Sequence, residues 1–199
     1  YATILLRTII MSMNTQTIHY HTQDELKQLL KAIDNKRDRA IILTAYTYGL
    51  RASEVGILER DDIDFERLRI RITRLKNSIS SEYPLRPEVA KAIKAYLRTR
   101  KDQSPILFVS KRGLPISRRM LDVLMKKYGQ KAGLPQDKQH FHCLKHSIAT
   151  HLLETTNDIM FVKDWLGHKN IQNTLVYAQL TNKARDEQAR KAFASLKIS

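Results

Sequence analysis

Residues 67–72 read RLRIRI, and they decide the fold class because the spacing of apolar residues changes at this point. Leu68, Ile70 and Ile72 alternate with three arginines. This two-residue period is typical of a strand with one buried face. Turn-forming residues follow, so residues 82–86 are expected to return as the antiparallel partner strand.

The rest of the expected sheet is small. Pro84 lies inside the partner strand, and because proline cannot donate to a strand ladder, this strand is expected at an edge. Residues 106–110 form a short apolar run and are the candidate third strand. The sequence therefore predicts an antiparallel sheet of about three strands.

Most of the remaining chain has apolar residues at helical spacing. Thr22 and Glu25 have the spacing of a capping box, and Gly49 is placed to end a later helix. Helices are expected over residues 23–35, 36–48, 53–58, 87–99, 117–131, 142–155, 159–166, 171–179 and 183–194. The fold class predicted from these patterns is α+β, mainly α-helical, with a small antiparallel sheet.

The overall charge is strongly positive. The 199 residues include 35 Lys and Arg against 20 Asp and Glu, which gives a formal net charge of +15 and a pI near 10.0. Such an excess favours a polyanionic partner, most often nucleic acid, although a solvated basic surface would give the same total. The one cysteine, Cys143, excludes an intrachain disulfide and fits a reducing cytoplasm.

One domain over residues 22–199 accounts for the expected elements, and it ends in a tail helix. Residues 1–21 are interpreted as an N-terminal extension or as a remnant outside the fold. Their opening stretch YATILLRTII is broken by Arg7 and is too short for a bilayer, which needs about 20 apolar residues. No association with a membrane is expected.

Positive charge gathers in the middle of the chain. Arg118 and Arg119 fall in the first turn of one expected helix, where free backbone N–H groups also favour phosphate. A basic turn with Lys111 and Arg112 precedes that helix. We expect these four residues, together with Arg74, to contact DNA, and the alternative is an ordinary solvated surface.

Residues 140–152, HFHCLKHSIATHL, contain four histidines, one cysteine and one lysine, and all of these except His140 fall in the helix expected over residues 142–155. His142 and His146 are four residues apart, so a helix would present both to a zinc ion. Cys143 lies on another side of that helix and the pattern HExxH is absent, which argues against this alternative. A metal site is therefore not expected.

Three stretches together resemble one family of enzymes. They are TYGLRASEV at residues 47–55, the histidine-rich stretch at residues 140–152, and WLGHKNIQNTLVYAQL at residues 165–180. In this order and spacing they resemble the catalytic domain of tyrosine site-specific recombinases, also called phage integrases, which include the Xer-type enzymes. The resemblance extends over residues 22–193 and implies the fold of the DNA breaking-rejoining enzymes.

The resemblance also implies site-specific recombination or integration of DNA. The phenolic oxygen of a tyrosine would attack a phosphodiester, forming a 3′-phosphotyrosyl bond and freeing a 5′-hydroxyl. Attack by the 5′-hydroxyl of another strand would then join new partners. The covalent intermediate keeps the bond energy, so neither a metal nor another cofactor is implied.

By position in these motifs, Tyr177 corresponds to the nucleophile. Arg51 corresponds to an arginine that would grip the non-bridging phosphate oxygens, and Glu54 would orient it. Lys76, in the expected hairpin turn, corresponds to a lysine that would protonate the leaving 5′-oxygen, although Arg74 is close enough to confuse this match. Without the motifs, Arg51 would be interpreted as a helix-cap or surface arginine and Glu54 as part of a plain salt bridge. Lys76 would be an exposed turn lysine, and Tyr177 an ordinary tyrosine of an amphipathic helix.

The family pattern His-x-x-Arg falls on His142 and Lys145. His142 would bond the phosphate or accept the proton of the tyrosine. Lys145 departs from the pattern because lysine keeps the charge but loses bidentate geometry, so we expect an active but slower enzyme. His168 would reach a phosphate from a turn. Two further histidines, at positions 146 and 151, match positions of structural character and are assigned no chemistry.

The resemblance implies double-stranded DNA as partner, four protomers on two duplexes, and a location in the cytoplasm with the nucleoid. Family members usually carry a further N-terminal helical domain, so the chain is either an excised catalytic fragment or a naturally minimal enzyme. Two other classes stay open. One is a catalytically impaired DNA-binding regulator, because of Lys145, and the other is a basic helical RNA-binding protein.

Overall fold

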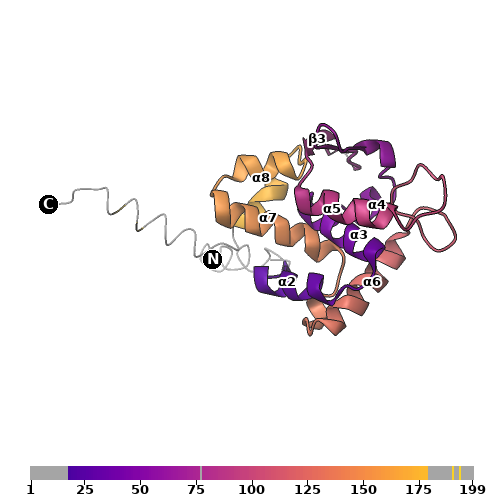
Figure 1. Cartoon of the computed structure of the whole chain (residues 1–199). Coiled ribbons are helices and arrows are strands. Elements are labelled where there is room, and N and C mark those ends of the chain that lie inside the picture. The colour runs from indigo at the N-terminus through magenta and orange to yellow at the C-terminus, as the bar shows by residue number, and fades with distance from the viewer. Residues whose placement is uncertain (1–17, 77, 179–189, 191–192, 194–199) are drawn as a thin grey trace.

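The computed structural model describes residues 18–76 and 78–178, together with residues 190 and 193. These residues form a mainly helical domain with a small sheet (Figure 1). The elements in chain order are α2 (Gln23–Ala32), α3 (Lys36–Thr47), α4 (Ala52–Val55), η1 (Arg60–Asp62), β1 (Ile63–Asp64), β2 (Arg69–Ile72), β3 (Ser81–Pro84), α5 (Pro87–Leu97), α6 (Arg118–Lys131), η2 (Gln136–Lys138), α7 (His142–Thr156), α8 (Ile159–Trp165) and α9 (Gln172–Ala178).

Eight of the nine helices expected from the sequence are confirmed as α2 to α9, with each end within three residues of its expected place. The ninth, over residues 183–194, lies outside the described residues. Within the part of the chain that the structure describes, no helix combines the length and the apolar character needed to cross a bilayer.

The sheet has three antiparallel strands in the order β1-β2-β3. Ile70 in the central strand lies opposite Ile63 of β1 and Tyr83 of β3, and all three are buried. Strand β3 is at the edge of the sheet, as Pro84 predicts.

Two details of the expected sheet are wrong. Residues 106–110 form isolated bridges outside the named strands, and the third strand is instead the two-residue β1. Leu68 is not on the buried face, because its φ of 53° places it in the turn before β2 with 54% of its surface exposed. A two-residue strand is too short to show a period in the sequence.

Side-chain caps fix where several helices begin. The Thr22 hydroxyl accepts from the backbone N–H of Glu25 at 3.2 Å, and the Glu25 carboxylate accepts from the backbone N–H of Thr22 at 2.7 Å. This completes the capping box of α2. The side chains of Asn35, Ser117 and Asp158 cap α3, α6 and α8 by accepting from backbone N–H groups of the first turn, without the reciprocal bond of a capping box. These contacts are local, so the sequence predicts the helix starts well.

Two apolar clusters hold the helices together. Helix α3 packs against α5 and α7, and α2 packs against α6, around the main core (Figure 1). Helices α7, α8 and α9 enclose a second cluster, which consists of Ile148, Ala149, Leu153, Val162, Leu166 and Tyr177. The tyrosine singled out in the sequence therefore lies inside an apolar layer of the C-terminal helices.

Gly49 ends α3 with a φ of +57°, as the sequence predicts. A Cβ atom at this position would lie 2.5 Å from Cδ2 of Leu166, so the end of α8 packs directly on the glycine. Gly133 follows α6 with a φ of +69°, but a Cβ there would meet no described atom within 4 Å. The two glycines share the backbone conformation and differ in their surroundings.

We expect Gly49→Ala to lower the free energy of unfolding by about 2–4 kcal/mol, of which about 1–2 kcal/mol reflects the left-handed backbone and the rest the overpacking. Gly133→Ala is the matched control and should lose only the backbone part. Urea unfolding of both variants measures the difference. Equal losses in the two would contradict the packing of Leu166 on Gly49.

Candidate active site

Arg51 is held at the start of α4 by the carboxylate of Glu54. Arg51 Nη1 donates to Glu54 Oε1 at 2.8 Å and to Ser78 Oγ at 3.0 Å. The backbone N–H of Arg51 donates to Glu54 Oε2 at 2.8 Å. The expected hydrogen bond between these side chains is therefore present. Arg51 keeps 23% of its side chain exposed while that of Glu54 is fully enclosed, so an interior carboxylate orients a surface guanidinium.

The Glu54 carboxyl is ionised although it is buried. Burial by itself raises its pKa, but the backbone N–H of Arg51 and the charge of Arg74 outweigh this effect. The Arg51 side chain and the backbone N–H of Leu75, at 3.2 Å, add further hydrogen bonds. The pKa of Glu54 is held below its ordinary value because these donors bind the charged form.

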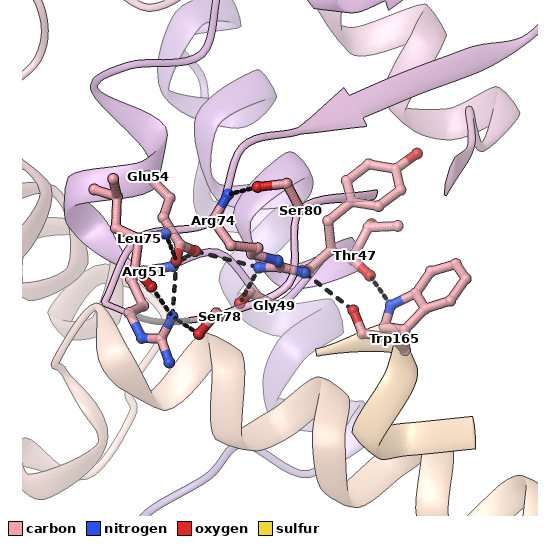
Figure 2. A network of polar contacts seen from close by, with 10 residues as sticks. Thr47, Gly49, Arg51, Glu54, Arg74, Leu75, Ser78, Ser80 and Trp165 are labelled. Atoms are coloured by element: carbon pink, nitrogen blue, oxygen red, sulfur yellow. Dashed lines mark hydrogen bonds and ion pairs between the residues drawn. The ribbon is translucent and has the colours of Figure 1, made fainter. Parts of the chain in front are cut away.

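Arg74 lies inside the protein, not on a DNA-facing surface (Figure 2). Its enclosed guanidinium donates to Glu54 Oε2 at 3.2 Å. It also donates to the backbone carbonyls of Tyr48, Gly49 and Trp165 at 2.7, 3.1 and 3.0 Å. The expectation that Arg74 contacts DNA is therefore corrected, because its side chain is committed to interior acceptors.

Lys76 lies on the loop between β2 and β3, which runs beside Arg51. The carbonyl of Leu75 accepts from Arg51 Nη1 at 3.4 Å, and Ser78 bonds the same nitrogen. Lys76 is exposed, and its φ of 55° is uncommon for a residue other than glycine. The structure thus places Lys76 between two residues of the loop, Leu75 and Ser78, that contact Arg51.

Lys145 is buried on α7, with 2% of its surface exposed. Among the described residues, its Nζ atom has no hydrogen-bond partner. Desolvation, followed by the charges of Arg51 and Arg74, lowers the pKa of Lys145 to about 7. Lys145 therefore lies close enough to Arg51 for that charge to act on it, and it carries an amine that is easily deprotonated.

Tyr177 lies on α9 with 3% of its surface exposed, and its hydroxyl is 3.0 Å from Nδ1 of His146. Burial raises the pKa of Tyr177, and the nearby charge of Arg51 lowers it in part. Burial, and then the charges of His142 and Lys145, lower the pKa of His146 to about 4. Near neutral pH a protonated phenol therefore faces an imidazole without charge, and its O–H can donate to a ring nitrogen.

His142 is exposed in the first turn of α7, and its ring contacts the ring of His146 edge-on at 4.4 Å. Partial burial, then the charges of Lys145 and Arg51, lower the pKa of His142. The structure brings His142 close enough to Lys145 and Arg51 for their charges to act on it, but the contact with the Tyr177 hydroxyl is made by His146. The four-residue spacing places both histidines on one face of the helix, and this is the signal in the sequence from which the contact of His146 could have been found.

His168 follows α8 directly after Gly167 and is buried. Its Nδ1 atom lies 3.0 Å from the hydroxyl of Thr174 in α9. Desolvation, then the charges of Lys145 and Arg51, lower the pKa of His168 to about 3. His168 is therefore a neutral imidazole that lies close enough to Lys145 and Arg51 for their charges to act on it.

The zinc alternative lacks support in the structure. His146 directs Nδ1 to Tyr177, and the thiol of Cys143 lies 3.9 Å from the carbonyl of Asp137. In the described parts of the chain, no group of three or more His, Cys, Asp or Glu residues is arranged to hold a metal ion.

The remaining predicted DNA contacts lie on the surface. Lys111 and Arg112 are exposed in a turn, and Arg118 and Arg119 are exposed at the start of α6. Ser117 caps this helix through the backbone N–H of Met120 at 3.2 Å. A role for these four cations in binding DNA stays a prediction.

Comparison with known proteins shows which family the chain belongs to. The model of the phage integrase family matches residues 19–184. The chain belongs to this family. Tyrosine recombinase XerA from Pyrococcus horikoshii is 38% identical over 174 residues, which cover 86% of this chain and 60% of XerA. The type 1 fimbriae regulatory protein FimE from Escherichia coli K12 is 33% identical over 175 residues, which cover 83% of this chain and 87% of FimE.

A crystal structure of XerA recombinase superposes with a TM-score of 0.77 and 28% identity, covering 89% of this chain and 64% of that chain. The phage integrase resemblance drawn from the three motifs is thereby confirmed, and so is the fold class. The chain spans about three fifths of the length of the XerA proteins that it matches.

We expect the contact between His146 and Tyr177 to appear in a double-mutant cycle. His146→Phe should lower the free energy of unfolding by about 1–3 kcal/mol, because a buried hydroxyl loses its acceptor. Adding Tyr177→Phe should restore about 0.5–1.5 kcal/mol relative to additive losses. Urea unfolding measures the four proteins. The pair Tyr46 and His151, with 2.9 Å between the hydroxyl and Nδ1, is a control of the same chemistry. Strictly additive losses at positions 146 and 177 would contradict the contact.

We expect Lys145→Met to raise the free energy of unfolding by at least about 1 kcal/mol near pH 7, because a buried ammonium without a partner is unfavourable. The folded pKa of Lys145, about 7, lies below the unfolded value. The penalty in the native protein is therefore full below pH 7 and fades as the pH rises toward about 10.4. Unfolding of both proteins across this range measures the gap, and a gap that widens with pH would contradict the assignment.

Proposed function

We propose that the chain is the catalytic domain of a tyrosine recombinase, which cleaves and rejoins DNA at specific sites with Tyr177 as nucleophile. The observation that carries the proposal is the Tyr177 hydroxyl, which lies 3.0 Å from His146 Nδ1 and close enough to Arg51 for that charge to lower its pKa. A phenol between an imidazole and a guanidinium has a proton acceptor on one side and a group that attracts phosphate on the other.

In the cleavage step, the Tyr177 oxygen bonds to phosphorus while the bond from phosphorus to the 5′-oxygen breaks. The phenolic proton passes to His146, and His142, whose ring contacts that of His146, supports the transfer. Lys76 gives a proton to the departing 5′-oxygen. In the joining step, the 5′-hydroxyl of another strand attacks phosphorus and gives its proton to Lys76. The bond from phosphorus to the Tyr177 oxygen breaks and His146 returns the phenolic proton, so no oxidant, reductant or nucleotide is consumed.

Three groups would stabilise the charge that develops on the phosphate oxygens. Arg51 offers a planar fork, and Lys145 offers a point charge in place of a second fork. Thr174 bonds Nδ1 of His168, so Nε2 is the atom that would face the phosphate. One such donor is typically worth about 3–4 kcal/mol in the transition state. The phosphate anion would also raise the pKa of Lys145, so that binding of DNA restores its charge.

Double-stranded DNA is the proposed partner. The formal net charge of +15 and the exposed cations Lys111, Arg112, Arg118 and Arg119 support this choice. We propose that four protomers act on two duplexes and that the protein works in the cytoplasm at the nucleoid, where such substrates lie.

A DNA-binding regulator with impaired catalysis is the second candidate. One observation favours it, since Lys145 stands where the family pattern has arginine and its pKa is about 7. At neutral pH such a residue loses the bidentate geometry and part of the charge. The two candidates share the fold and the DNA and differ in whether a covalent intermediate forms.

The test uses a target selected from random duplex DNA and then nicked, so that the short 5′-hydroxyl fragment diffuses away after cleavage. We expect a protein–DNA adduct that survives denaturation and is absent in Tyr177→Phe, which should still bind the duplex. Salt-sensitive binding to the duplex without an adduct would favour the regulator. A preference for RNA would contradict both.

A further inference from the structure

We propose that Arg74 is a positioning residue, which fixes the loop that carries Lys76 against Arg51 and so sets where the proton donor stands as the 5′-oxygen leaves. This proposal rests on the proposed function, because the proton transfer is assigned there to Lys76. Arg74 itself has a fully enclosed side chain, so it acts through its neighbours and not on the DNA.

The guanidinium of Arg74 joins the ends of two helices. It donates to the carbonyls of Tyr48 and Gly49 at the end of α3 and to that of Trp165 at the end of α8 (Figure 2). The last carbonyls of a helix lack partners within the helix and carry partial negative charge, so a cation is stable there. Arg74 therefore fixes its own segment relative to α3 and to the turn that carries His168.

The same guanidinium shares an anion with Arg51. Nη1 of Arg74 lies 3.2 Å from Oε2 of Glu54, while Oε1 accepts from the Arg51 side chain. The backbone N–H of Leu75, next to Arg74 in the chain, also donates to Oε1 at 3.2 Å. The positions of the two arginines are thus coupled through one buried carboxylate.

Both ends of the loop are tied to this network. The backbone N–H of Arg74 donates to Ser80 Oγ at 2.9 Å, and that of Ile79 donates to the carbonyl of Gly167 at 2.9 Å. Gly167 packs so closely that a Cβ there would lie 3.2 Å from two side-chain atoms of Arg74. Lys76, with its φ of 55°, lies between these two attachments, so its place depends on them.

Arginine suits this place in a way that lysine does not. The planar guanidinium reaches three carbonyls and one carboxylate from a single position, whereas an ammonium is a point charge with three donors. Arg74→Lys therefore keeps the charge beside Glu54 but loses part of the geometry that fixes the loop. Arg74→Lys therefore separates the effect of the positive charge beside Glu54 from the effect of holding the loop in place.

The experiment compares two DNA substrates that differ in one atom. In the second, sulfur replaces the bridging 5′-oxygen at the scissile phosphate, and a thiolate leaves without needing a proton. We expect Arg74→Lys to cleave normal DNA about 10- to 100-fold more slowly than the wild type, since a misplaced proton donor loses rate on this scale. On sulfur-bridged DNA its rate should return to that of the wild type, with unchanged affinity for both substrates.

Two further variants calibrate the result. Lys76→Ala should show the same loss on normal DNA and the same rescue by sulfur. Asp38→Asn disturbs a buried carboxylate that bonds Arg37 and Tyr128 at the opposite end of α3. It controls for a general loss of stability and should cleave both substrates like the wild type.

Arg74→Lys cleaving normal DNA at the wild-type rate would overturn the proposal, and so would an equal loss on both substrates. If Arg74→Lys does not fold, Ser80→Ala carries the test, because it frees the base of the same loop and leaves the buried ion pair intact. A loss on normal DNA that sulfur rescues is expected for Ser80→Ala, and a wild-type rate would overturn the proposal. Failure of the wild type to cleave either substrate would instead reject the proposed function.

Discussion

The site depends on one buried carboxylate. Glu54 accepts hydrogen bonds from Arg51, from Arg74 and from the backbone of Leu75, and its own side chain is fully enclosed. Removing one partner of such a group typically destabilises a protein by about 3–5 kcal/mol, because a buried charge is left without compensation. Helix α4, the loop after β2 and the ends of α3 and α8 must therefore assemble together. The half-buried guanidinium of Arg51 is thus fixed by a buried carboxylate.

Much of the fold could be predicted because its signals are local. Thr22, Asn35, Ser117 and Asp158 each cap a helix through a side chain that lies next to it in the sequence. The sheet was predicted less well, since β1 has two residues and owes its pairing to β2, not to a pattern of its own. Residues 106–110 have the apolar composition of a strand, but tertiary packing buries them without strand pairing.

The candidate site was likewise predicted only in part from the sequence. The family motifs gave the positions of Arg51, Lys145, His168 and Tyr177 along the chain, and the structure brings Arg51 close enough for its charge to act on the pKa of the other three. The burial of Arg74 could not be predicted, because an arginine that bonds interior carbonyls has the same sequence signal as one on a surface. Which histidine meets the tyrosine was also hidden, since it depends on how α9 packs against α7.

The burial and the charges around Lys145 would favour a bound anion. Burial, and then the charges of Arg51 and Arg74, lower the pKa of Lys145 to about 7, and the charge of Glu54 opposes this shift. Burial first, and nearby basic groups second, lower the pKa values of His146 and His168 to about 4 and 3, so both rings are neutral near pH 7. The loss of these protons limits the repulsion between the basic groups. The Nζ atom of Lys145 has no hydrogen-bond partner among the described residues. A phosphodiester brings one negative charge and several acceptor oxygens, so it would both reprotonate the lysine and satisfy it. The same anion would by itself disfavour ionisation of Tyr177, so the proposed attack depends on His146 taking the phenolic proton as the bond to phosphorus forms.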